Sequence, residues 1–366
     1  MKDEGWSIMT KFTYKSIYTI LAILLAGILY LLLWPVRVDP AAWTPDPAVP
    51  LTGLLTPNER LAAVERLELP DGHGPEDVAL DSLRRIYGGV QDGRIYRFQP
   101  DGSGLEVFAN TGGRPLGLHF DRRGNLIVAD AYRGLLAVHP DGKVDLLVNS
   151  AGGVPFRFTD DVDIARDGKI YFSDASHKFS QAEYRLDALE HRPNGRLLVY
   201  DPTTGQTRIL LDSLYFANGV AVSPDQQFVL VNETWKYRVR RYWLAGDRAG
   251  QSDIFIDRLP GFPDGISCNG KDRFWLALAS PRNPLVDKLA QQPFLRKMIA
   301  RLPDALQPDA IPYGFVIGLD MEGRITDNLQ SPDGKPYGMI TSVQADGDTL
   351  YLGSLKERAI GRYIGQ

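Results

Sequence analysis

A six-fold internal repeat is the feature that most constrains how this chain of 366 residues can fold. Each copy is a short strand of alternating apolar residues, a Gly/Asp turn, and a second strand that opens ten residues after the copy begins. A repeat built only from strands is typical of sheets packed radially around one axis. The copies begin at Glu76, Leu116, Asp160, Asn218, Asp264 and Ile340, and their second strands begin at Ile86, Leu126, Ile170, Phe228, Phe274 and Leu350.

Each copy continues into a third and a fourth strand, joined by turns of the Pro-Asp-Gly type that favour hairpins. The sixth copy ends after its third strand, near Tyr363. The unused segment 61–69 precedes the first copy and supplies the missing strand, which closes the ring and removes an exposed sheet edge. We therefore predict an all-β fold, a six-bladed β-propeller over residues 59–366. A β-sandwich is the structural alternative, but it does not explain six copies in register.

Four of the six copies begin with a side chain that carries oxygen. Equivalent positions of a radial repeat converge on its axis, so these side chains are expected to surround one point. Carboxylate and amide oxygens are the ligands that Ca²⁺ prefers, whereas zinc favours His or Cys. The alternative is that these side chains line a wet channel or cap turns, since Asn-Gly and Asp-Gly are also ordinary turn pairs. The predicted calcium ligands are Glu76, Asp160, Asn218 and Asp264.

The end of each second strand adds further polar side chains. Asp130, Asp174 and Asn232 each lie fourteen residues after their copy begins, and we expect them to support the calcium ligands or the loops above them. His177 follows the second strand of the third copy and is a candidate pocket residue. The remaining histidines carry no comparable signal: His119 lies on an inner strand, and His73, His139 and His191 look like loop residues.

Two long insertions interrupt the repeat between second and third strands. They lie on the face of the propeller that carries the four predicted calcium ligands, which we call the ring. They span residues 176–194 and 280–311, and the second has a helical apolar period. Insertions of this length in a compact domain are typical of functional lids, although they can also pad a blade. Their apolar content favours a small apolar substrate.

These features together indicate hydrolysis of an ester or a lactone. A calcium ion with an open position polarises a carbonyl oxygen, and Asp264 is the candidate catalytic residue, either as nucleophile or through a water. No GxSxG motif supports a serine hydrolase. The formal net charge of −4 gives no footprint for nucleic acid, and the single cysteine, Cys268, permits no intrachain disulfide.

The N-terminus carries a separate signal. Residues 16–36 are uncharged and long enough to cross a bilayer, and Lys11 and Lys15 precede them. We predict a signal anchor at 16–36 with residues 1–15 cytoplasmic, a Pro-rich tether at 37–58, and the propeller on the periplasmic or exoplasmic side. A cleaved signal peptide is the alternative, but the apolar run is too long and no small-residue cleavage site follows.

Long stretches of the chain resemble the strictosidine synthase-like family, in particular its adipocyte plasma membrane-associated protein branch. They are RPNGRLLVYDP (192–202), LYFANGVAVSPD (214–225), NETWKYRVRRYWL (232–244) and LPGFPDGI (259–266). The resemblance covers residues 61 to the C-terminus and implies a six-bladed propeller within a superfamily that includes gluconolactonases, paraoxonases and calcium-dependent phosphotriesterases.

The resemblance also bears on single positions. Glu76, Asn218 and Asp264 match the calcium ligands of gluconolactonase-like enzymes, and Asp160 replaces a common Asn. Paraoxonases have histidines at the positions of Leu116 and near Ala131, so a paraoxonase-type dyad is absent here. Strictosidine synthase uses a catalytic glutamate where this chain has Thr341. Threonine cannot carry out the proton transfers of that glutamate, so the comparison argues against a condensation of the strictosidine synthase type. A non-catalytic propeller that binds a ligand or partner through a structural calcium is the alternative function.

Overall fold

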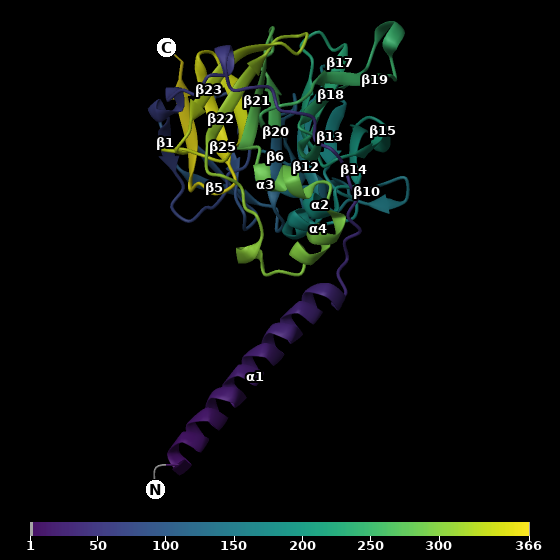
Figure 1. Ribbon diagram of the computed structural model, residues 1–366. Coiled ribbons are helices and arrows are strands. Elements are labelled where there is room, and N and C mark those ends of the chain that lie inside the picture. Colours follow the sequence, from purple (N-terminus) through teal and green to yellow (C-terminus); the bar gives the residue numbers. More distant parts are fainter. Residues whose placement is uncertain (1–2, 366) are drawn as a thin grey trace.

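The computed structural model describes residues 3–365 and confirms the six-bladed β-propeller (Figure 1). Within these residues, six antiparallel sheets of four strands each pack around one axis, and a two-stranded hairpin lies outside them. Five sheets are formed by consecutive strands, in the order inner, second, third and outer. This order follows from the repeat, because each turn joins neighbouring antiparallel strands.

The strands agree with the predicted phrases to within a few residues. The first two blades are β2 (Val78–Leu80), β3 (Ile86–Gly89), β4 (Arg94–Phe98) and β5 (Glu106–Asn110), then β6 (Pro115–Phe120), β7 (Leu126–Asp130), β8 (Gly134–Val138) and β9 (Val144–Val148). The third and fourth are β12 (Thr159–Ile164), β13 (Ile170–Asp174), β14 (Gly195–Asp201) and β15 (Gln206–Leu214), then β16 (Ala217–Val222), β17 (Phe228–Glu233), β18 (Arg238–Trp243) and β19 (Ser252–Ile256). The fifth is β20 (Gly261–Cys268), β21 (Phe274–Pro281), β22 (Gly314–Leu319) and β23 (Ile325–Ser331), and the hairpin is β10 (Ser150–Ala151) with β11 (Val154–Pro155).

The sixth blade closes the propeller with a strand from the other end of the sequence. It contains β24 (Ile340–Asp346), β25 (Thr349–Ser354) and β26 (Ala359–Ile364), and β1 (Glu65–Glu68) completes it, as predicted for segment 61–69. β1 pairs antiparallel with β26, so that Leu67 lies opposite Ile360. Both side chains are buried in one apolar cluster with Ile86 of the first blade. The closure therefore joins blades six and one by backbone pairing and by packing.

The inner strands approach one another so closely around the axis that no side chain larger than that of glycine fits at Gly219 or Gly265. A Cβ atom on Gly219 would lie 2.4 Å from the carbonyl oxygen of Asp264, and one on Gly265 would lie 2.4 Å from that of Thr341. Both glycines lie inside strands, β16 and β20. The Asn-Gly and Asp-Gly pairs are therefore not hairpin turns; their glycines permit the close approach of neighbouring blades.

Both insertions contain helices, as the second insertion's periodicity indicated. The first holds α2 (Tyr184–Glu190), and the second holds α3 (Pro284–Leu289) and α4 (Pro293–Ile299). We call residues 176–194 the first lid and residues 280–311 the second lid. Both lie on the face of the propeller where the ring residues begin the inner strands, and Figure 1 shows their helices on the side that faces α1.

The N-terminal helix α1 (Asp3–Leu33) leaves the body of the protein and contains an apolar stretch, Tyr14–Leu33, that is long enough to cross a membrane (Figure 1). The helix ends three residues before the predicted boundary at Val36. Pro35 explains this end, because proline has no N–H to donate and disfavours the helical conformation for the residue before it.

Residues 37–58, predicted as an extended tether, are extended except for a 3-10 turn at Gly53–Leu55, and they lie against the propeller; we call them the strap. Val38 is buried, and the backbone N–H groups of Trp43 and Val49 donate to the carbonyl oxygens of Ala290 and Arg258. The strap therefore connects α1 to the propeller along a fixed path over the lids, rather than as a free linker.

Candidate metal and substrate site

Three of the four predicted calcium ligands lie within inner strands, and a local irregularity in the backbone directs them. The pairing of each of these inner strands with its second strand slips at the ring position, which is the signature of a β-bulge. The slips lie between Thr159 and Val162, between Ala217 and Val220, and between Pro263 and Ile266, so they enclose Asp160, Asn218 and Asp264. A bulge re-aims a side chain, and here it turns these side chains toward the axis. Glu76 lies two residues before β2.

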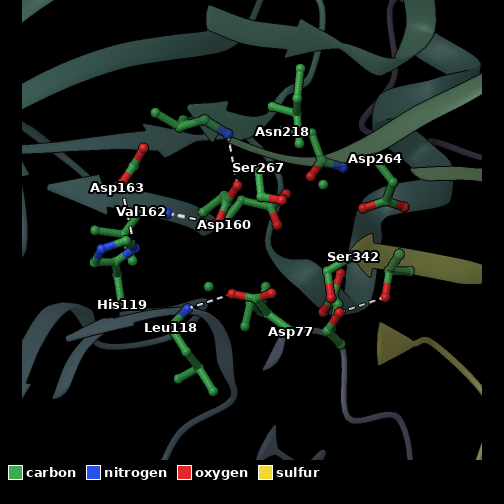
Figure 2. A pocket seen from close by; sticks show the side chains of 18 of the residues that line it. Asp77, Leu118, His119, Asp160, Val162, Asp163, Asn218, Asp264, Ser267 and Ser342 are labelled. Atoms are coloured by element: carbon green, nitrogen blue, oxygen red, sulfur yellow. Dashed lines mark hydrogen bonds and ion pairs between the residues drawn. The ribbon is translucent and has the colours of Figure 1, made fainter. Parts of the chain in front are cut away.

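Two cavities meet at this ring. A channel of about 80 Å³ runs along the axis between the inner strands, and a larger cavity of about 350 Å³ lies between the ring and the lids. Among the described residues, those that line both cavities are Glu76, Asp160, Asn218 and Asp264. The structure thus brings the four predicted residues together at one boundary, and Figure 2 shows Asp160, Asn218 and Asp264 around the space of the channel.

Burial and mutual repulsion dominate the electrostatics of the ring. Burial raises the pKa of Asp160 well above its usual value, and the carboxylates of Glu76 and Asp264 raise it further. The pKa of Asp264 is also raised, first by burial and then by Glu76, although a hydrogen bond from Asn218 acts in the opposite direction. Three carboxyl groups therefore crowd one buried position at a cost that a cation would relieve.

These residues fit a hard cation in the chemistry of their donors. All four offer oxygen, three are formally anionic, and their repulsion is the kind that a divalent ion offsets. Within residues 3–365, no three His, Cys, Asp or Glu side chains are drawn together tightly enough to form a metal site as they stand. Calcium binding would therefore require these side chains, which line one boundary, to rotate toward one another.

Arg114 is a member of this cluster that sequence reasoning missed. Arg114 is 3% exposed, and its guanidinium donates to the carbonyl oxygen of Gly74 at 2.9 Å and to Glu76 Oε2 at 3.4 Å. Its Nε and Nη1 atoms have no partner. Arg114 precedes Leu116 by two residues, so the copy of the repeat that begins with an apolar residue places a cation near the ring instead. That apolar first residue was the available signal.

Two of the predicted supporting residues contact the ring through its backbone. The side-chain amide of Asn232 donates to the carbonyl oxygen of Asp264, and the Thr341 hydroxyl donates to that of Glu76 at 2.6 Å. Thr341 also lines the channel. These bonds come from neighbouring strands, so they fix the backbone that carries two of the ring carboxylates.

The other three candidates line neither cavity. Asp130 accepts hydrogen bonds from the Thr111 hydroxyl and from the backbone N–H of Tyr132, and Asp174 forms a buried ion pair of 2.5 Å with Arg196. His177 Nδ1 lies 2.7 Å from the carbonyl oxygen of Asn194. All three therefore hold the ends of strands and loops, and they do not face the space where a ligand would bind.

Replacing Thr341 with Val tests the support of the ring. The variant keeps the shape of the side chain and removes the buried hydrogen bond to Glu76, so the free energy of unfolding should fall by about 1 kcal/mol. Urea unfolding of the purified protein measures this loss. Thr326→Val, at an exposed position of β23, is the matched control and should leave the stability within about 0.5 kcal/mol of the wild type. A Thr341 variant with unchanged stability would contradict the role assigned to this hydroxyl.

The channel below the ring holds carboxylates that the sequence analysis did not single out. Asp77 accepts a hydrogen bond from the backbone N–H of Leu118 at 2.8 Å, and Asp161 accepts one from Val220 at 2.7 Å. Each bond crosses from one blade to the next, and Figure 2 shows the bond between Leu118 and Asp77. Asp77 directly follows Glu76 in the sequence, and Asp161 directly follows Asp160. Their hydrogen bonds join the inner strands of neighbouring blades, which have no backbone pairing with each other.

The upper cavity is apolar above the ring and is covered by the lids and the strap. Among the described residues, its lining includes the aromatic side chains Trp43, Phe158, Tyr184, Phe216, Trp235, Tyr237 and Phe262, and Val286, Leu289 and Ala290 from the second lid. An apolar chamber with a few polar groups at one end is the usual form of a small-molecule site.

His191 and Trp43 in this cavity were also missed from the sequence. Their rings stack at a centroid distance of 4.1 Å and an angle of 6°. His191 is 3% exposed, and its Nε2 atom has no partner. A tryptophan inside the Pro-rich segment was the signal available, because a solvated tether has no use for a large aromatic side chain.

Comparisons with known proteins place this architecture in a family. A profile described as strictosidine synthase matches residues 160–247, and one described as strictosidine synthase-like, N-terminal, matches residues 53–98. The adipocyte plasma membrane-associated protein of Rattus norvegicus is 34% identical over 374 residues, which cover 96% of this chain and 98% of that protein. The chain belongs to the strictosidine synthase-like family. Strictosidine synthase-like 6 of Arabidopsis thaliana is 38% identical, over 87% of this chain and 86% of that protein.

Solved structures with the same fold are more distant in sequence. A gluconolactonase from Xanthomonas campestris has a TM-score of 0.59 at 17% identity and covers 90% of this chain and 98% of its own. A calcium-binding regucalcin from Agrobacterium tumefaciens has a TM-score of 0.57 at 14% identity and covers 81% and 95%. At these identities the similarity shows the propeller fold alone, which agrees with the superfamily inferred from the sequence.

Proposed function

We propose that the chain is a membrane-anchored, calcium-dependent hydrolase of apolar esters or lactones. The observation that carries this proposal is the position of the ring: four oxygen-bearing side chains separate a polar axial channel from an apolar cavity of about 350 Å³. A substrate whose apolar part fills the cavity would present its carbonyl group to the ring. The naming of one structural neighbour as a gluconolactonase and of another as calcium-binding supports this chemistry.

The residues of the chain have distinct tasks in this proposal. Glu76, Asp160, Asn218 and Asp264 would hold calcium, which when bound supplies a positive charge that polarises the carbonyl oxygen. The aromatic wall orients the apolar part of the substrate, and the lids exclude bulk water, which strengthens electrostatic interactions inside. Asp264 serves as the catalytic carboxylate, either attacking the carbonyl carbon or accepting a proton from the attacking water. If Asp264 attacks, the C–O bond of the ester breaks, the alcohol leaves, and a water then hydrolyses the acyl anhydride on Asp264; if water attacks, the same C–O bond breaks in one addition and elimination. One water is consumed in both cases, and an ester gives an alcohol and a carboxylic acid whereas a lactone gives a hydroxy acid.

The apolar helix supports the proposed location. Tyr14–Leu33 is long enough to span a bilayer, and a relative of almost the same length is named for association with the plasma membrane. With Lys11 and Lys15 on the cytoplasmic side, the propeller and its cavity would face the periplasm or the outside of the cell.

The test is a substrate panel with and without metal. Full-length protein in detergent is assayed on aryl esters, lactones and a phosphotriester, in calcium and in chelator, and calcium binding is measured by calorimetry. Asp264→Asn should lower turnover at least about 100-fold, as is typical when a group that stabilises the transition state is removed. Asp212→Asn, at an exposed position of β15, is the matched control and should keep full activity.

The panel also separates the alternative function. Calcium binding that is lost in Asp264→Asn, with no turnover on any substrate class, would replace the hydrolase with a binding propeller held by a structural ion. Turnover that survives both the chelator and Asp264→Asn would contradict the proposed site.

A further inference from the structure

The end of α1 is attached directly to the second lid. Arg301 donates from Nε to the carbonyl oxygen of Trp34 at 2.6 Å and from Nη1 to that of Leu31 at 2.9 Å. In return, the Tyr30 hydroxyl donates to the carbonyl oxygen of Arg301 at 3.1 Å. Figure 1 shows this junction, with α4 next to the end of the long helix. The second lid therefore lies where the apolar span of α1 ends.

The strap holds both lids in this position. The backbone N–H of Ala41 donates to the carbonyl oxygen of Glu190 in the first lid, and Arg296 of the second lid donates to the carbonyl oxygen of Ala41. Further along, the N–H of Trp43 donates to Ala290 of the second lid. Because the strap follows α1 directly, these contacts orient the cavity side of the propeller toward the membrane that α1 would cross.

The second lid has the reverse of the polarity expected for a helix in water. Of the two charged residues in α4, Lys297 is half-buried and Arg296 is inside: Arg296 is 4% exposed and donates to the carbonyl oxygens of Leu189 and Ala290. Its apolar neighbours Phe294 and Leu295 are 61% and 42% exposed. Leu306, farther along the same lid, is 67% exposed. An outward apolar face next to a membrane span is explained if that face meets lipid.

We propose that the second lid lies in the interfacial layer of the bilayer that α1 crosses, with Phe294, Leu295 and Leu306 in contact with lipid. The mouth of the upper cavity is then at the membrane surface. The exposed residues of the cavity lining mark this mouth: Tyr184 on the first lid, Asp309 on the second, and Lys356 on the sixth blade. Asp309 bridges Arg185 at 3.0 Å and Lys356 at 3.3 Å, which holds the two lids and the blade together.

This inference rests on the proposed anchor and deepens the proposed function, because it names the source of the substrate. A ligand that enters beside the lipid headgroups is an amphipathic, membrane-dissolved ester or lactone, and its apolar part would pass from the leaflet into the aromatic chamber without crossing water.

The experiment measures the depth of single labels in the full chain. Cys268→Ala removes the native thiol, and Phe294→Cys and Leu306→Cys each introduce one site for an environment-sensitive fluorophore. Leu83→Cys is the matched control, because Leu83 is equally exposed, at 69%, but lies in the turn after β2 on the opposite face of the propeller. Leu25→Cys in α1 reports on the anchor itself. Each labelled protein is reconstituted in lipid nanodiscs, with its folding checked by a cooperative thermal transition.

We expect nitroxide-labelled lipid to quench the labels at Phe294, Leu306 and Leu25 several-fold more than the label at Leu83, and aqueous iodide to show the reverse order. Quenching at Leu25 alone would overturn the lid contact and leave the anchor intact, whereas no quenching at Leu25 would overturn the anchor. Labels at Phe294 and Leu306 that are protected from both quenchers would show that a protein, either a partner or a second copy, covers this face, and would also overturn the proposal.

Discussion

Replacing Arg114 with Met should lower the free energy of unfolding by about 3–5 kcal/mol in the presence of a chelator, which is the typical cost of breaking a buried ion pair. Burial raises the pKa of the Glu76 carboxyl, and the buried guanidinium of Arg114 acts in the opposite direction. Without Arg114, the crowded carboxyl groups lose the nearby positive charge. Met fills a similar volume, so the effect reports on charge and hydrogen bonding rather than on a cavity.

Calcium should reverse part of this loss. If a divalent ion binds the ring, it supplies positive charge where Arg114 no longer does, so the difference in stability between wild type and Arg114→Met should shrink when chelator is exchanged for calcium. Urea unfolding in both conditions measures the two differences. Arg123→Met, at an exposed turn position, controls for loss of a surface charge and should change the stability by less than about 0.5 kcal/mol. An Arg114 variant that is as stable as the wild type in chelator would refute the electrostatic role of this side chain.

The architecture could be predicted from the sequence because the repeat determines it. Six phrases with the same spacing specify inner and second strands, and the copy that lacks an outer strand requires one from elsewhere, which β1 provides. The ring followed from the same register. The register did not reveal how the ring side chains reach the axis. Bulges at the ring positions turn them inward, and Gly219 and Gly265 allow neighbouring blades to approach.

The parts of the site that could not be predicted come from segments without periodicity. Trp43 lies in irregular backbone, and His191 follows the short helix α2 with φ of 51°, so no pattern of strand or helix assigns either side chain a direction. Asp130 and Asp174 show the opposite case. They do occupy equivalent positions of the repeat, as their spacing predicted, but their side chains hold the ends of strands and line neither cavity. A repeat identifies equivalent positions, and the chemistry at each position is decided by neighbours that only the fold brings together.

His191→Phe should make the protein less sensitive to acid. Burial lowers the pKa of His191 from about 6.5 to about 2, and the charges of Lys236 and Arg296 act in the same direction. The folded protein therefore keeps this imidazole neutral, while the unfolded chain binds a proton below about pH 6.5. Because the unfolded state binds more protons, stability falls as the pH decreases through this range. At pH 5 the linkage amounts to about 2 kcal/mol.

Phenylalanine cannot bind a proton, and its ring can still stack on Trp43. The free energies of unfolding of wild type and His191→Phe, measured in urea at pH 7.5 and pH 5, should therefore diverge by about 2 kcal/mol in favour of the variant at the lower pH. Tyr215→Phe is the matched control, since it alters a ring that contacts His191 and leaves the imidazole in place. Its stability should follow the pH dependence of the wild type. Parallel pH dependences for wild type and His191→Phe would mean that this histidine takes up a proton in the folded state, and that the wall of the upper cavity is wetter than its contacts indicate.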